Sequence, residues 1–244
     1  HRDLHSFPTR RSSDLGSGSY VIELTGADDV TLEDLRLTGA EYGIYVADGA
    51  GSERLTVSSS RIDGHTWSGV FVGTSNVGVR LIGNEVDGMG QHGIELRADQ
   101  AEVIDNEVHG NAQFGIYISS YVTGMLVRGN EVYNDLWCGI SVSGSGEVVD
   151  NEVYGNGYYG IQCYAFSSGL TVGGNVVHDN GTAGIHSQGN VLVTGNTVYG
   201  HSDSGDVGIY VWSGNPVVSG NVVYGNDLGI FVYNSGVVSD NRVY

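Results

Sequence analysis

The sequence predicts an all-β solenoid of about ten stacked coils, each with three short parallel strands. Two observations predict it. A marker residue, usually Asn, recurs every 20 to 25 residues, with an aliphatic residue three places before it and another two places after it. Most copies also contain the pattern Gly-aliphatic-x-aliphatic, as in Gly115-Ile116-Tyr117-Ile118. A unit of this length cannot bury its own apolar side, so it must stack on its neighbours.

The glycine-led segment is the first strand of each coil. Its apolar residues recur at every second position, which is the spacing of a strand with one buried face. We expect the inward positions of neighbouring coils to align in a column. These positions are Ile44, Val70, Ile94, Ile116, Ile140, Ile161, Ile185, Ile209 and Ile230.

The second and third strands lie on either side of the marker residue. The second-strand column is Val57, Leu81, Val103, Val127, Val148, Val172, Val193, Val218 and Val238, and the third is Ile62, Val86, Val108, Val132, Val153, Val177, Val198, Val223 and Val243. β-Branched residues stacked in this way are typical of a parallel-sheet core. Between the two strands, Asn tolerates the left-handed backbone angle that a one-residue bend needs, and stacked amides can hydrogen-bond along the axis.

The Gly-Asn-x-Val corners at residues 83–86 and 129–132 resemble the asparagine ladder of the pectate-lyase-like superfamily. The resemblance covers nearly all of residues 20–244. It implies a single-stranded right-handed parallel β-helix with three sheets, and a groove along the first sheet that holds polysaccharide in the carbohydrate-active members. The fold alone does not specify a function.

The first residues do not follow the repeat. Residues 5–15 resemble the conceptual translation of a short-read sequencing adapter, and they contain no apolar core of a signal peptide. We therefore expect residues 1–19 to be a non-native or disordered segment and residues 20–244 to be the β-helix domain. The last copy stops within a repeat at Tyr244, so we expect a fragment truncated at both ends.

Composition excludes some partners. The formal charge is −18 and the chain contains no Lys, which argues against a nucleic-acid partner and makes a polyanion an awkward one unless a divalent cation bridges it. No run of eighteen apolar residues occurs, so no membrane span is expected. Cys138 and Cys163 fall at different positions of the repeat, too far apart to bond, and we expect two buried thiols.

Outward positions of the first strand are rich in aromatic residues. Such side chains outside a solenoid suggest a platform for sugar rings, unless long corner loops cover them. The predicted substrate-binding residues are Tyr45, Phe71, Tyr164, His186, Tyr210, Trp212, Phe231 and Tyr233. A polysaccharide is thus the expected partner.

Catalytic candidates lie on the same face. Glu95 and Arg97 are two residues apart on one strand, His92 precedes them, and Tyr117 flanks Glu95 on the next coil. A lyase or epimerase of uronic acids needs a base, an acid and a cation beside the carboxylate, and these four residues could supply them. The alternative is a surface ion pair. The lysine base of several β-helix lyases and the Tyr-Gly-Phe-Asp-Pro-His signature of mannuronan epimerases are both absent.

The third strand carries an outward row of four Glu residues on consecutive coils, Glu85, Glu107, Glu131 and Glu152. Like charges so close repel, so either Ca²⁺ bridges them or water and nearby Arg side chains screen them. A solvated face is favoured because no loop adds backbone carbonyl ligands; no cofactor is certain and no metal ligand is assigned. Beside this row, we expect the Tyr residues to form a stacked ladder.

Two classes of function remain open. One is a secreted or cell-surface protein that binds a polysaccharide, with cleavage or epimerisation as a further step. The other is a non-catalytic, adhesin-type stalk in which the repeats supply length. The outward aromatics favour the first, and the low density of catalytic groups favours the second.

Overall fold

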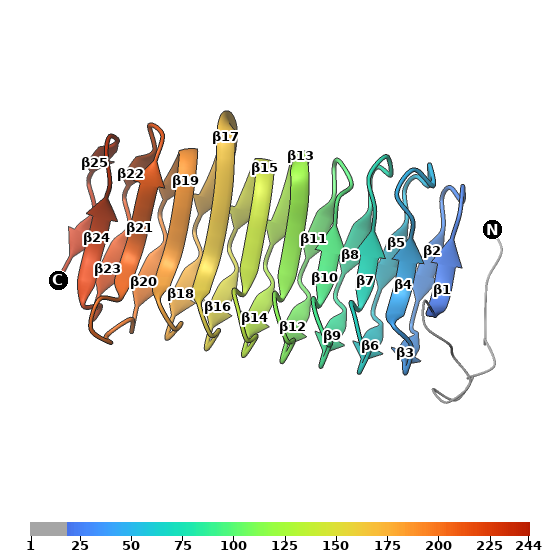
Figure 1. Cartoon of the computed structure of the whole chain (residues 1–244). Helices are drawn as coiled ribbons and strands as arrows, with labels where there is room; N and C mark the ends of the chain where they lie inside the picture. Colours follow the sequence, from blue (N-terminus) through green and yellow to red (C-terminus); the bar gives the residue numbers. More distant parts are fainter. Residues whose placement is uncertain (1–18) are drawn as a thin grey trace.

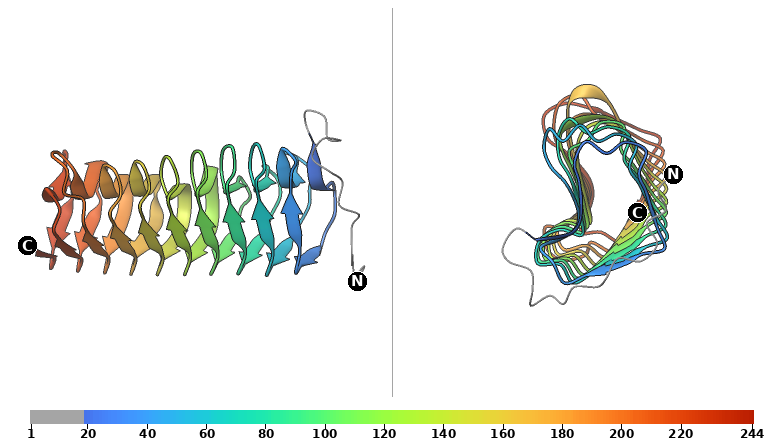
Figure 2. Two further views of the ribbon diagram at one scale, coloured as in Figure 1. Left: turned by 90° about the horizontal axis from the view of Figure 1, so that it is seen from below. Right: turned by 90° about the vertical axis from the view of Figure 1, so that its right-hand side faces the viewer.

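The computed structural model describes residues 19–244, without the side chains of residues 120, 121 and 166–168, and shows one parallel β-helix (Figure 1). Seen along the axis, the coils superimpose on one another (Figure 2). The predicted non-native segment falls almost entirely outside the described residues. Among the described residues, no helix is long and apolar enough to cross a bilayer.

Ten first strands stack in parallel with the predicted register. Ile44, for example, pairs with Val70, and Ile94 pairs with Ile116. The strands are β1 (Tyr20–Leu24), β4 (Tyr42–Val46), β7 (Val70–Val72), β10 (Ile94–Leu96), β13 (Ile116–Arg128), β15 (Ile140–Val149), β17 (Tyr159–Gly173), β19 (Ala183–Thr194), β21 (Val207–Ser213) and β24 (Leu228–Val232).

The remaining strands form the other two sides of each coil. Separate second strands are β2 (Thr31–Glu33), β5 (Thr56–Ser58), β8 (Arg80–Ile82), β11 (Glu102–Ile104), β22 (Val217–Ser219) and β25 (Val237–Ser239). Third strands are β3 (Arg36–Thr38), β6 (Arg61–Asp63), β9 (Glu85–Asp87), β12 (Glu107–His109), β14 (Glu131–Tyr133), β16 (Glu152–Tyr154), β18 (Val176–His178), β20 (Thr197–Tyr199), β23 (Val222–Tyr224) and β26 (Arg242–Val243).

The expectation of three separate sheets needs a correction. The first and second strands share one 16-stranded sheet, and the third strands form a 10-stranded sheet. They merge because β13, β15, β17 and β19 continue through the corner as single long strands. Close approach of the backbones permits this: a Cβ on Gly144 would lie 1.9 Å from the carbonyl oxygen of Val122 in the neighbouring strand.

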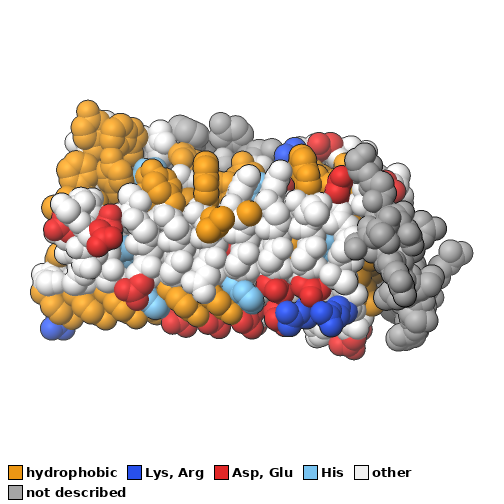
Figure 3. Space-filling model, turned by 60° about the horizontal axis from the view of Figure 1, so that its bottom comes forward, with side chains coloured by type: hydrophobic (Ala, Val, Ile, Leu, Met, Phe, Trp, Pro, Cys, Tyr) orange, Lys and Arg blue, Asp and Glu red, His pale blue; other side chains and the backbone are white. Residues whose placement is uncertain are grey.

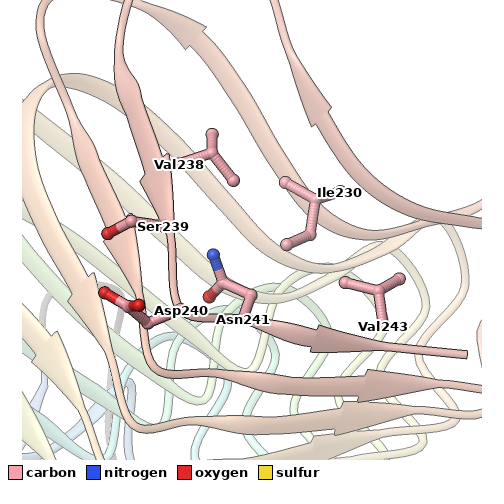
Figure 4. A pocket seen from close by; sticks show the side chains of 6 residues that line it. All are labelled: Ile230, Val238, Ser239, Asp240, Asn241 and Val243. Carbon is pink, nitrogen blue, oxygen red and sulfur yellow. The ribbon is translucent and has the colours of Figure 1, made fainter.

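The three aliphatic columns form the core, as predicted. Their members are almost entirely buried from Ile44 to Val223. Cys138 and Cys163 are both buried and free, also as predicted. In the last coil, Val238 and Val243 are exposed, and they line a pocket of about 300 Å³ together with Ile230, Ser239, Asp240 and Asn241 (Figure 4). This pocket is the end of the core column, where the inward side chains have a neighbouring coil on one side only.

The asparagine ladder forms at the corner between the second and third strands. From Asn84 to Asn241, each side-chain amide donates to the carbonyl oxygen of the next Asn side chain at 2.8–2.9 Å. The sequence argument placed the left-handed backbone on the Asn itself. In the structure it falls on the residue before, as at Gly83 (φ 62°) and Asp105 (φ 53°). That residue makes the bend, which leaves the Asn side chain free to point along the axis.

A second polar ladder occupies the corner between the third and first strands. Its members are His65, Asn111, Asp135, Asn156, Asn180, His201 and Asn226. From Asn111 onwards they lie five residues after an Asn of the first ladder, and this spacing is a sequence signal that the marker pattern overlooked. The two ladders fix the corners, so the first strands between them hold their side chains in constant register.

Candidate functional site

The first-strand face is the set of outward side chains on the glycine-led part of the ten first strands, before the corner that leads into the second strand. The register places them in the predicted order: Glu23, Tyr45, Phe71, Glu95, Tyr117, Ser141, Gln162, His186, Tyr210 and Phe231. In the view of Figure 3, hydrophobic side chains gather along the upper edge of the molecule, most densely at its C-terminal end. The two halves of the face differ in their chemistry.

Arg97 is the centre of the N-terminal half. Its guanidinium donates to Glu95 Oε1 at 2.9 Å, and its Nη1 lies 3.7 Å from Asp48 Oδ2. It also lies over the ring of Phe71, with the guanidinium carbon 5.2 Å from the ring centroid. Gly73 lets Asp48 approach this site, because a Cβ on Gly73 would come within 2.5 Å of the Asp48 nitrogen. The predicted Glu95–Arg97 ion pair therefore forms, with a second carboxylate that the sequence argument did not include.

Burial and neighbours tune the two carboxylates in opposite directions. Glu95 is buried, which raises its pKa, although the adjacent Arg97 and a 3.4 Å hydrogen bond from Ser68 oppose that shift. Asp48 is exposed, and hydrogen bonds from the backbone and hydroxyl of Thr74 lower its pKa, with a smaller contribution from Arg97. The guanidinium is thus held between a buried carboxyl group and an exposed one.

His92 and Tyr117 do come close to each other, with ring centroids 5.0 Å apart. His92 is buried against Phe114 as well, and burial lowers its pKa to about 4, with Arg97 adding to the effect. Its Nδ1 is buried without a hydrogen-bond partner. The imidazole is therefore neutral at pH 7, which is the state that a general base requires.

Phe71, one of the predicted substrate-binding residues, is largely covered by its neighbours. It points outward as expected, but it is only 7% exposed. Tyr45 stacks on it with centroids 5.2 Å apart, and Arg97 lies over it. Phe71 supports its neighbours, whereas Tyr45 is half-buried.

The C-terminal half exposes its aromatic side chains. Trp212 and Tyr233 are 43% and 46% exposed and stack with centroids 4.7 Å apart. Phe231 is also exposed, and Tyr210 is half-buried beside Trp212. Trp212 does not pair with Gln188 of the preceding coil, as strict repetition of the register would require. A register irregularity after Ser187 pairs Gln188 with Ser213, and Trp212 is the extra residue.

His186 is buried within this half. It stacks on Tyr159, with centroids 4.6 Å apart, and makes an edge contact with Tyr210. Burial lowers its pKa to about 4, and its Nδ1 is buried without a hydrogen-bond partner. With one aromatic ring stacked on it and another in edge contact, His186 is only 8% exposed.

Uncharged polar groups lie between the aromatic ones. Ser141 donates to Gln162 Oε1 at 3.1 Å, and Gln162 Nε2 donates to the Tyr164 hydroxyl at 2.9 Å. Tyr164 is half-buried, so its ring is partly open to solvent. These groups match the hydroxyl groups of sugars as donors and acceptors.

Several residues of this face were missed by the sequence argument. Tyr42, Phe114 and Tyr159 precede the glycine of the repeat, at the position that His92 also occupies. All four take part in aromatic contacts on the first-strand face. Reading the residue before each glycine could have found them. Asp48 carried no such signal, because a corner loop brings it to Arg97 from two coils away.

The third strands carry the predicted stacked ladder. Rings of His109, Tyr133, Tyr154, His178, Tyr199, Tyr224 and Tyr244 lie 4.7–5.4 Å apart and within 12° of parallel. The ladder also supplies partners to the adjacent Glu row: Tyr133 donates to Glu107 at 2.7 Å and Tyr154 to Glu131 at 2.8 Å. In Figure 3 this ladder and the acidic row lie along the lower edge.

One group on the third strands has the spacing of metal ligands. Glu85, Asp87 and His109 place one ligand atom each within 4.8 Å of one another. Arg61 lies 2.6 Å from Glu85 and 3.3 Å from Asp87, however, and so already forms an ion pair with each carboxylate. The Glu row therefore has protein partners, and a bridging Ca²⁺ is not required to explain it.

Comparison with known proteins gives a consistent fold. A family model described as a right handed beta helix region matches residues 20–177, 68–216 and 124–244. The mannuronan C-5 epimerase AlgE4 A-module of Azotobacter vinelandii is similar in structure, with a TM-score of 0.68, 16% identity, and coverage of 91% of this chain and 80% of that one. No curated protein matches the sequence.

Two further structures resemble the chain. The periplasmic alginate epimerase AlgG has a TM-score of 0.56 and 19% identity, over 85% of this chain and 50% of that one. The Dettilon tailspike protein gp208 has a TM-score of 0.58 and 14% identity, over 93% and 56%. This chain thus spans about half the length of AlgG. Likeness at this level of identity establishes the fold alone.

Proposed function

Because this chain belongs to the right handed beta helix family, we propose that it binds a polysaccharide along the first-strand face, as a secreted or cell-surface protein. The observation that carries the proposal is the exposed aromatic group of Trp212, Phe231 and Tyr233 on a regular parallel sheet. Exposed aromatic rings cost solubility and offer flat apolar surfaces, which suit the faces of sugar rings.

The repeat geometry suits a polymer better than a single sugar. Neighbouring strands are about 4.8 Å apart, so a glycan that runs along the axis meets the side chains of a new coil every 4.8 Å or so. Contacts added by successive sugars act together, so affinity should increase with chain length. The similar structures include an alginate epimerase and a mannuronan C-5 epimerase, both polysaccharide-modifying enzymes by name, and this supports a carbohydrate ligand.

Catalysis is a second candidate, favoured by one observation. Glu95, with a raised pKa, and the neutral His92 form an acid and a base on one surface, with Arg97 and Tyr117 beside them. In this arrangement, His92 would accept a proton and Glu95 would donate one. Incubation with polyuronates and neutral glycans, followed by analysis of chain length and sugar composition, tests it. A Glu95→Gln variant should lose any activity found.

Binding itself is tested by retardation of the intact protein in native gels that contain polysaccharide. The proposal predicts retardation by at least one glycan, and stronger retardation with longer chains. An adhesin-type stalk, in which the repeats supply only length, predicts unchanged mobility in every gel. No retardation across neutral and acidic glycans, with and without Ca²⁺, would exclude the proposed function.

A further inference from the structure

We infer that the polysaccharide is an uncharged glycan and that it binds over the C-terminal half of the first-strand face, from β15 to β24. The inference rests on the proposed function, since it names the class of ligand for the same face. It follows from the positions of the charged side chains on this face and from the contacts that they already make within the protein.

A polyuronate would need positively charged side chains to pair with its carboxylates, and the first-strand face has few of them. Among the described residues, Arg97 is the one basic side chain on the first-strand face that is charged at neutral pH. Its two terminal nitrogens face Glu95 and Asp48, its Nε is buried from solvent, and one side of its plane lies on Phe71. Arg97 is therefore already paired with two carboxyl groups of its own protein, and a glycan carboxylate would have to displace one of them.

Among the described residues, the C-terminal half carries no charged side chain at the outward positions before the corner; Glu147 of β15 lies beyond the corner, in the second-strand part. From β15 to β24, these positions are Ser141, Ser143, Gln162, Tyr164, His186, Gln188, Tyr210, Trp212, Ser213, Phe231 and Tyr233. His186 stays neutral at pH 7 because it is buried between aromatic rings. Asp206 and Asp227 stand at the corner before β21 and β24, so the charged groups there are carboxylates as well.

The groups that remain are those that recognise neutral sugars. Rings of Trp212 and Tyr233 supply apolar faces, and the amides of Gln162 and Gln188 with the hydroxyl groups of Ser141 and Tyr164 supply hydrogen bonds. Each of these groups can donate or accept without a desolvated charge, so sugar hydroxyl groups can pair with them at little electrostatic cost. The net charge of −18 adds a long-range repulsion that disfavours any polyanion.

The test uses native gels at low ionic strength that contain either a neutral glycan (xylan, glucomannan or β-glucan) or an acidic one (alginate or polygalacturonate). EDTA is present, so that no divalent cation can bridge two carboxylates. We expect retardation by at least one neutral glycan, and apparent affinity for the acidic glycans at least about tenfold weaker. Equal or stronger retardation by alginate or polygalacturonate would overturn the inference while leaving the proposed function intact. No retardation by any glycan would mean that the proposed function itself has failed.

A pair of variants tests the charge argument directly. The double variant Asp48→Asn, Glu95→Gln keeps one acceptor oxygen for Arg97 at residue 95 and one for Thr74 at residue 48. It removes the two carboxyl groups that compete with a glycan carboxylate for Arg97. It should gain retardation by polygalacturonate. The matched control Glu23→Gln removes an exposed carboxylate of the same face that does not contact Arg97, and it should gain much less. If the double variant gains no more than this control, the occupation of Arg97 does not exclude acidic glycans and the inference fails.

Discussion

The two halves of the first-strand face share one backbone and differ in what they expose. From β4 to β10, the outward side chains contact one another: Arg97 pairs with two carboxyl groups and lies over the ring of Phe71. From β19 to β24, the outward side chains are uncharged, and Trp212 and Tyr233 remain open to solvent. Inward residues of the two halves are interchangeable aliphatics, so they specify the fold and carry no information about the ligand. The chemical difference between the two halves therefore lies in the outward residues of the ten first strands.

The largest expected effect concerns a feature that both halves share, a buried neutral histidine. His92 and His186 each have a pKa lowered to about 4 by burial, compared with about 6.5 in the unfolded chain. The folded state therefore binds fewer protons, and the stability that each neutral imidazole contributes above pH 6.5 is lost as the pH falls towards 4. For His186 alone, this loss amounts to about 2–3 kcal/mol between pH 7.5 and 4.5.

The variant His186→Phe isolates this effect, because it keeps the ring contact with Tyr159 and removes the titrating group. Urea unfolding of both proteins at pH 7.5 and 4.5 should show a smaller acid-induced loss for the variant. If wild type and variant lose the same free energy of unfolding, His186 is not the neutral, buried group described above. The same comparison with His92→Phe measures the acid-induced loss of stability in the N-terminal half.

A smaller effect is expected where the two halves meet, at Asp135 in the second ladder. Asp135 is buried, and burial raises its pKa well above the ordinary value even though Asn111 donates to its Oδ1. Its Oδ2 has no partner, whereas the amide nitrogen of Asn156, the next member, donates to the carbonyl oxygen of Val132. The Asp135 carboxyl group thus occupies a ladder position at which the next member, Asn156, donates a hydrogen bond through its side-chain amide.

Asp135→Asn should therefore raise the free energy of unfolding by about 1–2 kcal/mol at pH 7.5. A carboxyl group whose folded pKa is raised contributes stability that is complete below its unfolded pKa and is lost as the pH rises. The advantage of the variant should accordingly shrink towards pH 4, as measured by urea unfolding at both values. Asn156→Asp, the reverse change on the following coil, should destabilise at pH 7.5. A neutral or destabilising Asp135→Asn would contradict this role.

The smallest expected effect is that of salt on glycan binding. If the ligand is uncharged, raising NaCl from 50 mM to 1 M should alter its apparent affinity by less than about twofold, because no ion pair crosses the interface. A fall of tenfold or more would show that charges in the N-terminal half contribute to binding. Gel retardation at several salt concentrations measures this.

Much of this structure could be predicted from the sequence, because a solenoid repeats its constraints. Ile44 and its equivalents gave the register, and the outward order from Glu23 to Phe231 followed by alternation. Contacts between coils through loops could not be predicted, and Asp48 is the example: its approach to Arg97 depends on loop shape. The exposure of a ring was equally hidden, because Phe71 and Phe231 occupy the same outward position and differ only in their neighbours. The register slip at Trp212 reflects one extra residue in a corner, which periodicity alone does not place.

One measurement tests the central claim most directly. Trp212 and Trp67 are similarly exposed, at 43% and 46%, but Trp212 belongs to the open aromatic half and Trp67 to the corner beside β7 in the charged half. Both are replaced by Ala, and the retardation of each variant by the neutral glycan that binds wild type is compared. Loss of one stacking ring should cost about tenfold or more in affinity for Trp212→Ala, with an unchanged melting temperature, while Trp67→Ala should bind like wild type. Equal losses in the two variants, or retained binding by Trp212→Ala, would contradict a glycan site on the C-terminal half.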